Sequence, residues 1–349
     1  MAEILPIVLN KNFERIGMLD DLISVIWTKR YYVHGDFQIQ IPINPDNVSK
    51  MVIGNYIVRD DDECVGIIEK IDLSYSEDSQ RILTASGRFL TVILSRRIIA
   101  EQTQVNGTLD FAINKLINDA IISPDIAARQ ISNFILGNYE LSQTISCQYT
   151  GKNLYEVISE LALQYGFGFR IRLNDSNQFV FELYEGVDRS YNQNINPYIV
   201  FSEEYDNLLN SEYIQDWMNV ITDVLAAGEG EGIDRKTVWV TNADAPTGID
   251  RYEFYDDSRN TSSNQGEIPE EQYIQELAEI GRENLTAYTV TLSGEVDSRN
   301  VKFGEDVFIG DIVTIENKSI GYYTNVRIIE LIESVDSSGM HSIIPTFGS

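Results

Sequence analysis

The stretch FGEDVFIGDIVTIENKSIGYYTNVRIIELIESVDSSGMHSIIPTF, residues 303–347, decides the fold class. Its apolar runs break at Gly310-Asp311, which suits a tight turn or a bulge. Residues 317–319 predict a hairpin turn, and residues 320–333, rich in Tyr, Thr, Val and Ile, predict the strand that follows it. A second turn and a closing strand are predicted at 337–339 and 340–347. A hairpin with a returning strand predicts a small antiparallel sheet or barrel, which suits binding or assembly.

Composition predicts an ordered, strongly acidic protein. The 349 residues are 43% hydrophobic, enough for two or three domains with cores of their own. The 26 Lys and Arg against 54 Asp and Glu give a net charge of −28, which repels phosphate and argues against nucleic-acid readout. Solubility is the ordinary role of such a charge, and it is compatible with DNA passing without being held. Cys64 and Cys147 lie far apart and outside any CxxC, so neither a disulfide framework nor structural zinc is predicted.

Targeting signals are weak throughout the sequence. The N-terminal apolar run has six residues with no basic residue before it, too short for a signal peptide. No apolar run approaches the roughly 20 residues that span a bilayer. We therefore expect a protein made and folded in a cytoplasm, without stable membrane insertion.

Residues 1–105 are predicted to form a β-rich first domain. Residues 37–41 alternate strictly between apolar and polar, as a half-buried strand does. Several short strands separated by turns at 44–47 and 60–63 predict a barrel or split barrel. Arg88 and Arg97, in the apolar segment that follows, are expected to pair with acidic neighbours. The predicted strands are 4–9, 22–27, 31–33, 37–41, 56–58, 65–68, 71–75 and 82–87.

Residues 106–186 predict an inserted α+β domain. A first amphipathic helix is expected over 106–120, with Thr108 as N-cap and Pro124 as its end. The best helix covers 153–165, because Asn153 and Glu156 form a capping-box-like start and Gly166 suits the stop. Its apolar face is interpreted as core. Strands are predicted at 144–149, 167–173 and 178–184.

Residues 187–349 predict a second β-barrel domain. Residues 187–217 are interpreted as aromatic and Asn-rich connections, and residues 242–268 as a long, exposed polar loop. The glycines of 228–232 carry no phosphate-cradle signal, since two glutamates lie among them and no Lys-Ser/Thr pair follows; a hairpin tip is predicted. A helix is predicted at 269–285 and strands at 219–226, 236–241 and 290–296. The fold class is therefore α+β, predominantly antiparallel β, with two small barrels around an inserted helix-plus-hairpin domain.

No catalytic, cofactor-binding or metal-binding residue is predicted. His34 and His341, the two histidines, lie near opposite ends of the chain and outside any HExxH or GxSxG motif. The acidic run 60–63 lacks the alternating pattern of a calcium loop, and a solvated turn is expected. With 54 carboxylates, two at a given spacing do not indicate a glycosidase. We predict no cofactor and no enzymatic activity.

Five stretches together resemble a known family. They are 65–69, 87–99, the helix–strand unit GKNLYEVISELALQYGFGFRI at 151–171, NVITDVLAAGEGEGIDRKTVWV at 219–240, and the closing stretch with its Gly-Asp turn and final Pro-Thr-Phe-Gly. In this order they resemble the siphophage tail hub proteins, also called tail-associated or baseplate hub proteins, that are common in prophages of Gram-positive bacteria. The resemblance covers about residues 2–347.

This resemblance implies a structural role in the virion tail tip, assembled in the host cytoplasm. Such proteins form a homotrimer whose two tail-tube-like barrels per subunit make a pseudo-sixfold ring. The ring joins the sixfold tail tube and distal tail protein to the threefold tip and lines the DNA channel. The implied partners are the distal tail protein or tube, the tape measure protein and a receptor-binding, tip or lysin protein, with DNA passing unbound.

Two alternative functions stay open from sequence. With 19 tyrosines and three tryptophans, β-rich domains can present aromatic platforms to sugars, as in a carbohydrate-binding module at the host surface. A part of a tail-associated cell-wall hydrolase is the other alternative. Many relatives carry a C-terminal peptidase or sugar-binding extension, so this sequence is either a hub whose activities belong to separate proteins or a piece of a longer chain.

Overall fold

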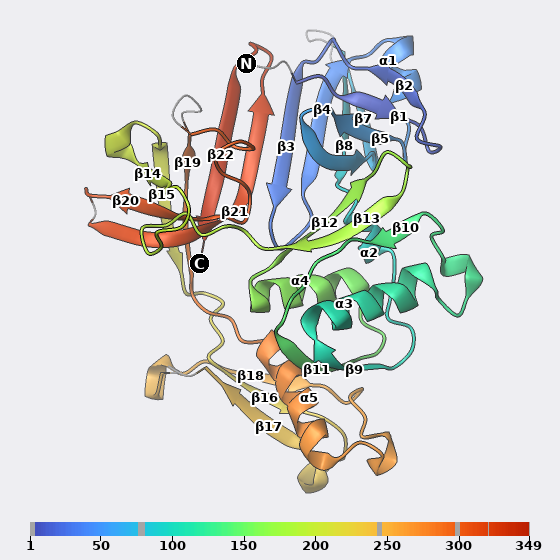
Figure 1. Cartoon of the computed structure of the whole chain (residues 1–349), viewed down its shortest axis with the longest axis vertical. Coiled ribbons are helices and arrows are strands. Elements are labelled where there is room, and N and C mark those ends of the chain that lie inside the picture. The colour runs from blue at the N-terminus through green and yellow to red at the C-terminus, as the bar shows by residue number, and fades with distance from the viewer. Residues whose placement is uncertain (1–3, 76–80, 243–245, 297–300, 320, 349) are drawn as a thin grey trace.

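One large sheet organises the molecule (Figure 1). The computed structural model describes residues 4–75, 81–242, 246–296, 301–319 and 321–348. Eight strands lie side by side in the order β15-β19-β22-β21-β3-β4-β8-β7; beside this path β20 pairs with β21, and β14 pairs with β20. Each strand of the path is antiparallel to its neighbour. The strands are β3 (Ser24–Arg30), β4 (Asp36–Pro42), β7 (Lys70–Ser74), β8 (Ile82–Arg88), β14 (Val200–Ser202), β15 (Leu209–Asp216), β19 (Thr289–Glu295), β20 (Ile312–Asn317), β21 (Tyr322–Val335) and β22 (His341–Gly348).

A second, four-stranded sheet covers the N-terminal half of this path. Its order is β2-β1-β5-β6, and the two sheets enclose a core around Trp27, Phe37 and Ile57. The predicted alternation in β4 is confirmed, since its apolar residues are buried and its polar ones are not. The strands are β1 (Ile7–Leu9), β2 (Arg15–Met18), β5 (Tyr56–Arg59) and β6 (Asp62–Ile67).

Local expectations for this N-terminal part need three corrections. Residues 31–33 form the turn between β3 and β4, not a strand. The turn expected at 44–47 begins helix α1 (Pro45–Lys50) instead, because the Asn44 side chain accepts a hydrogen bond from the backbone N–H of Asn47 at 2.8 Å. Strand β2 had no sequence signal.

The seam between β3 and β21 joins distant parts of the chain. Arg30 lies opposite Glu330, and Val25 opposite Val335. Strands of the predicted first and second barrels therefore share one sheet. Mostly antiparallel β structure with helices is confirmed, whereas closure into two barrels and the three-domain division stay predictions. The predicted boundary at 105 falls inside β9 (Thr103–Thr108).

The segment that follows β8 and precedes β14 along the chain forms the helical part. Helix α3 (Leu109–Ile117) continues as a π-helical turn, η1 (Asn118–Ile122). The observed helix therefore begins three residues later than the one predicted over 106–120. Thr108 occupies the N-cap position without the expected side-chain bond. Helix α4 (Leu154–Tyr165) is confirmed, with Asn153 accepting from the Tyr155 N–H at 3.0 Å and Gly166 left-handed at φ 77°. The remaining elements are α2 (Val92–Ser95), β10 (Phe134–Leu136), β11 (Thr144–Tyr149), β12 (Gly168–Leu173) and β13 (Phe179–Tyr184).

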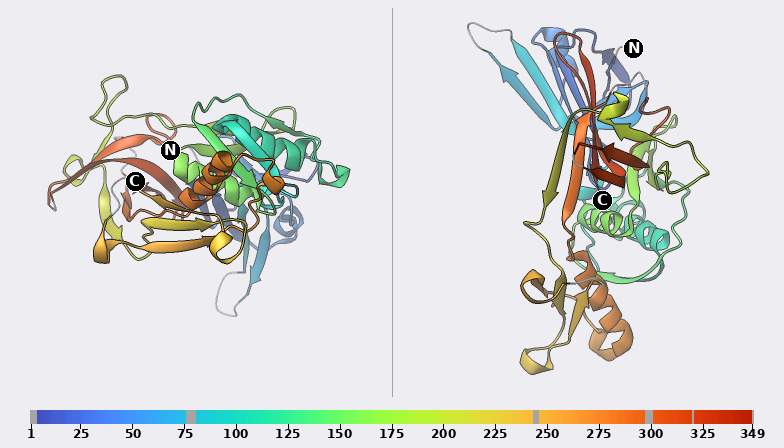
Figure 2. Two further views of the ribbon diagram at one scale, coloured as in Figure 1. Left: turned by 90° about the horizontal axis from the view of Figure 1, so that it is seen from below. Right: turned by 90° about the vertical axis from the view of Figure 1, so that its left-hand side faces the viewer.

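A small subdomain extends from the lower end of the large sheet (Figure 2). Helix α5 (Glu270–Glu283) packs on one face of a three-stranded sheet of order β17-β16-β18 through Tyr273 and Leu277. The expected exposed loop 242–268 is wrong in part, because it contains β18, which pairs parallel to β16. Residues 243–245 of that loop, and residue 320 of the strand expected at 320–333, lie outside the described residues. The strands are β16 (Asp223–Ala227), β17 (Thr237–Thr241) and β18 (Glu253–Asp257).

In the part of the chain that the structure describes, none of the helices has both the length and the apolar character that crossing a membrane requires.

Candidate functional site

The face of the eight-strand path that points away from the cores is a candidate functional surface, called here the open face. Alternation places it: Phe37, Ile39 and Ile41 of β4 turn inward, so Gln38 and Gln40 turn to the other side. Cross-strand pairing extends the face from one edge to the other. Uncharged polar residues dominate it, with isoleucines between them: Ser24, Ile26, Gln38, Gln40, Ile82, Thr84, Ser86, Ile214, Thr291, Ser293, Ile332, Ser334, Ser342, Ile344 and Thr346.

Side chains of the open face hydrogen-bond one another along the sheet. Ser24 Oγ donates to Gln40 Oε1 at 3.0 Å, and Gln40 Nε2 to Thr84 Oγ1 at 3.5 Å. Across the seam, Arg30 Nε donates to Glu330 Oε2 at 2.6 Å, and Arg30 also contacts Asp36. The charged residues of the face are six acids and three bases: Asp36, Asp72, Glu212, Asp216, Glu295 and Glu330; Arg30, Lys70 and Arg88. A face of neutral polar and mainly acidic side chains suits contact with a polyanion without tight binding of it.

The eight-strand path consists of two halves with the same internal order. One half contains, in chain order, strands β3, β4, β7 and β8, and in space these strands lie in the order β3-β4-β8-β7. The other half contains, in chain order, strands β15, β19, β21 and β22, and in space these strands lie in the order β15-β19-β22-β21. In each half, the spatial order is therefore the first, second, fourth and third strand of that half along the chain. The halves join where the third strand of one, β21, meets the first strand of the other, β3.

The two edges of the path therefore form a matching pair. One edge is β7, a third strand, and the other is β15, a first strand, the same combination as at the internal seam. Both are well exposed: most residues of β15 and β7 lie on the surface. Edge strands present unpaired backbone groups to another chain. Strand β15 was not predicted from sequence, since it lies among the expected connections of 187–217.

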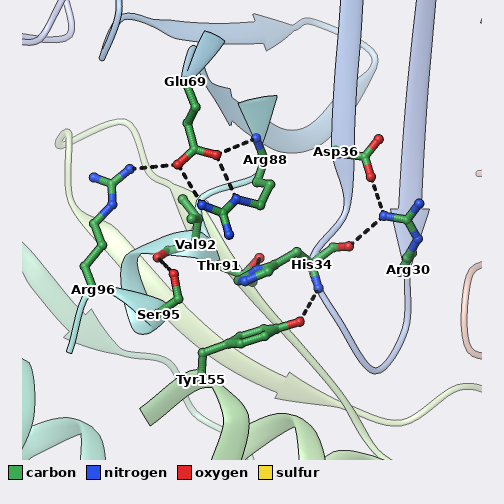
Figure 3. A network of polar contacts seen from close by, with 10 residues as sticks. All are labelled: Arg30, His34, Asp36, Glu69, Arg88, Thr91, Val92, Ser95, Arg96 and Tyr155. Carbon is green, nitrogen blue, oxygen red and sulfur yellow. Dashed lines mark hydrogen bonds and ion pairs between the residues drawn. The ribbon is translucent and has the colours of Figure 1, made fainter. Parts of the chain in front are cut away.

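A second polar cluster joins the large sheet to α4 (Figure 3). His34, in the turn between β3 and β4, stacks on Tyr155 of α4 with ring centroids 3.5 Å apart. The His34 backbone N–H donates to Tyr155 Oη at 2.9 Å, and Nδ1 lies 3.2 Å from Thr91 Oγ1. Burial, with the nearby Arg88 guanidinium second, lowers the pKa of His34 to about 4. His34 is thus a neutral structural joint.

Glu69, in the same polar cluster, binds Arg88 and Arg96 (Figure 3). Arg88 donates to its carboxylate from Nε at 2.7 Å and from Nη2 at 3.0 Å, and Arg96 approaches it at 3.5 Å. Burial opposes ionisation of Glu69, but these arginines outweigh it and lower the pKa of Glu69. The expected pairing of Arg88 is confirmed. That of Arg97 is wrong, because Arg97 donates to the backbone carbonyls of Arg96 and Arg129.

The acidic run 60–63 contains the expected turn, at residues 60–61, and is exposed except at Asp62, but three of its carboxylates also form ion pairs. Asp61 accepts two hydrogen bonds from Arg59, at 2.9 and 2.6 Å. Asp62 binds Lys29 at 2.6 Å, and Glu63 binds Arg170 at 2.7 Å. These pairs hold the turn against three different strands, so the carboxylates of Asp61, Asp62 and Glu63 have structural partners.

The other residues considered from sequence also have structural partners. His341 Nε2 lies 2.8 Å from Glu333 Oε1. Cys64 and Cys147 are free thiols, and burial raises the pKa of Cys147 to about 12. Residues 228–232 connect β16 to β17 as a hairpin tip, as expected. Among the described residues, no group of three or more His, Cys, Asp or Glu side chains is placed to hold a metal ion.

Comparison with known proteins settles the family. The profile of the siphovirus ReqiPepy6 Gp37-like protein matches residues 5–349. The chain belongs to this family of siphovirus tail proteins. The expected resemblance to phage tail proteins is therefore confirmed, and membership makes the chain a virion tail component. A search of curated proteins found no significant match.

Solved tail proteins share the fold of this family member. A tail protein from Neisseria meningitidis superposes with a TM-score of 0.60 at 15% identity, covering 100% of this chain and 97% of its own. Prophage tail protein gp18 from Listeria monocytogenes gives 0.55 at 10%, covering 99% and 94%. The 43 kDa tail protein of prophage MuSo2 from Shewanella oneidensis gives 0.58 at 15%, covering 99% and 98%. At these identities the likeness establishes the fold.

Proposed function

We propose that this tail protein is a structural hub of the tail tip, acting as a homotrimeric ring that joins the sixfold tube to the threefold tip. One observation carries the proposal: the large sheet has two halves of identical strand order and two edges that match its own internal seam. A sheet built in this way can continue from copy to copy. Edge β7 of one copy meets edge β15 of the next as β21 meets β3 within the chain.

Strand direction supports this continuation. The strands of the path alternate in direction, so β7 and β15 of successive copies run antiparallel, as β21 and β3 do. Each copy contributes two equivalent halves. Three copies therefore supply six, which matches the sixfold symmetry of a tail tube. Closing the sheet also removes its exposed edges.

The open face is the proposed lining of the DNA channel. Both cores of the large sheet lie on its opposite side, around Phe37 and around Phe347, so a closed ring turns the open face toward the lumen. Ser, Thr and Gln give the lumen short, neutral side chains. Its six acids against three bases repel phosphate, so DNA passes with weak backbone affinity.

Partners follow from the same arrangement. The ring offers one rim to the distal tail protein or tube and the other to a receptor-binding, tip or lysin protein, with the tape measure protein ending at the channel. The carbohydrate-binding alternative has less support. Exposed Trp239 and Tyr255 are candidate sugar platforms, but Arg251 and Arg235 lie over their rings at 5.3 and 5.8 Å. Hits on a glycan array would revive that alternative.

Assembly of edge variants tests the hub. In the antiparallel arrangement the start of β7, Lys70, lies toward the end of β15, Asp216. Replacing Lys70→Glu places two acids together there and is expected to shift the protein from trimer to monomer in sedimentation velocity. Lys236→Glu, at the hairpin tip of the small subdomain, is the matched control. Quantitative mass spectrometry of tail particles should give three copies per particle; a stoichiometry equal to that of the tube subunit contradicts the proposal.

A further inference from the structure

An uncovered aromatic groove follows directly after β15. Trp217 and Tyr288 stack in parallel, with ring centroids 4.4 Å apart and planes within 2°. They frame a groove of about 760 Å³ that Tyr252 and Asp250 also line. Trp217 is 49% exposed, and the adjacent Met218 is 88% exposed. Large apolar side chains gathered on a surface in this way mark a site of association.

A basic corner lies at the other edge of the large sheet, defined by Lys70, Arg88, Arg96, Arg97 and Arg129. Arg97 donates to the carbonyl oxygen of Arg129 at 2.9 and 3.2 Å, and Arg129 to that of Ile98 at 2.5 Å. Among the described residues, neither arginine forms an ion pair with a carboxylate. Burial, and after it the charges of Arg129 and Arg96, lower the pKa of Arg97.

These two features complement each other in charge. The segment 217–288, which forms the groove and the small subdomain, has 15 acidic and five basic residues. The basic corner instead concentrates cations in a chain of net charge −28. Arginine also packs well on aromatic faces, and the stacked pair of Trp217 and Tyr288 offers such a face.

Strand order brings the two features together between copies. Trp217 directly follows the end of β15, and Glu69, which holds Arg88 and Arg96, directly precedes Lys70 at the start of β7. Antiparallel pairing of β7 with the β15 edge of the next copy sets these two ends side by side. The inference therefore rests on the proposed ring, and it adds a contact that the sheet edges alone do not provide.

We propose that the aromatic groove of each copy receives the basic corner of its neighbour. The small subdomain then reaches beneath the adjacent copy, where Arg97 and Arg129 gain the acidic and aromatic partners that they lack within the chain. Backbone pairing fixes the register of the ring, and this second contact fixes the spacing and tilt of its subunits.

Photo-crosslinking from Met218 tests the contact. A photoreactive amino acid replaces Met218 in the full chain, and trimers are formed from a mixture of this protein and isotopically heavy wild-type protein. We expect crosslinks from position 218 to heavy peptides within 88–129. The control position is Ile233, which is fully exposed on the hairpin tip of the same subdomain and should give none.

The outcomes separate this contact from the ring itself. A trimer that crosslinks from position 218 to other segments, or not at all, overturns the groove contact and leaves the hub intact. A protein that stays monomeric at all concentrations, and is not present as three copies in tail particles, overturns both.

Substitutions on the two sides provide an independent test. Trp217→Ala is expected to weaken trimer formation about tenfold, as loss of a central aromatic anchor does. The pair Arg97→Glu and Arg129→Glu should weaken it similarly, and adding Trp217→Ala to that pair should cost little more. Because Arg97 and Arg129 also bind carbonyls, the melting temperature of each variant is measured first. Additive losses would contradict a shared contact.

Discussion

The imidazole of His34 lies flat against the phenol ring of Tyr155, with centroids 3.5 Å apart and planes within 6°. This stack connects the β3–β4 turn of the large sheet to helix α4, which the backbone N–H of His34 also reaches through Tyr155 Oη. The contact is strongest when the imidazole is neutral, because burial and nearby Arg88 disfavour its protonation.

Acid should therefore weaken the fold through His34. The pKa of His34 falls from 6.5 to about 4 on folding. Between these values the unfolded chain binds a proton that the folded chain excludes, so stability is complete above about pH 6.5 and declines as pH falls toward 4. Since part of the ring contacts water, we expect a loss of about 1–2 kcal/mol.

Melting temperatures of wild type and His34→Gln across this pH range measure the effect. The variant should be less stable at neutral pH and show a shallower decline with acid. His341→Gln is the control, since its imidazole contacts Glu333 on a different part of the sheet. Parallel curves for wild type and His34→Gln would contradict the prediction.

Arg59 should be the most costly cation to remove. Its side chain is 2% exposed and binds Asp61 and Glu333, so it ties β5 of the small N-terminal sheet to β21 of the large one. Arg59→Met leaves the carboxylate of Glu333 without this partner and should cost about 3–5 kcal/mol of unfolding free energy. Urea unfolding measures it.

A double variant tests the assignment to Glu333. Adding Glu333→Gln to Arg59→Met should recover part of the loss, because the second change removes the uncompensated charge. Equal losses in the single and double variants would place the cost elsewhere.

Gly186 is predicted to tolerate no side chain. A Cβ at this position would lie 1.8 Å from the carbonyl oxygen of Gly310, which belongs to the turn before β20. Backbone cannot move aside as a side chain can, so Gly186→Ala should destabilise by at least about 1–3 kcal/mol. Gly107→Ala is the control, since its nearest neighbour is the Phe111 ring at 3.1 Å. Equal thermal stability of both variants would refute the prediction.

Glu276 should hold the small subdomain against the helical part. It is fully buried on α5 and accepts hydrogen bonds from Gln104, Gln148 and Gln272. Glu276→Leu removes the carboxylate that accepts from the half-buried Gln104 and the buried Gln148, at a cost of about 1–3 kcal/mol. We expect faster hydrogen exchange in α5 and β11. Glu271→Leu, exposed on the same helix, is the control, and unchanged exchange in the Glu276 variant would contradict this role.

Several site residues could be interpreted from sequence because their partners are close in the chain. Arg88 finds Glu69 across one hairpin, and Asn153 and Gly166 delimit α4 through local capping. Arg97 could not be predicted, since its carbonyl partner on Arg129 depends on how the 123–133 segment folds back. Strand β18 was missed for a similar reason: parallel pairing with β16 gives its polar residues no local strand signal.

The sequence by itself determined the β-rich class, the hairpins, the caps of α4 and the acidity, because each depends on residues a few positions apart. Only the tertiary structure decided that β3 pairs with β21, some 300 residues apart along the chain, and that the two halves repeat one strand order with matching edges. Local periodicity specifies which face of a strand is buried, but the neighbour of a strand is selected by the packing of the whole chain.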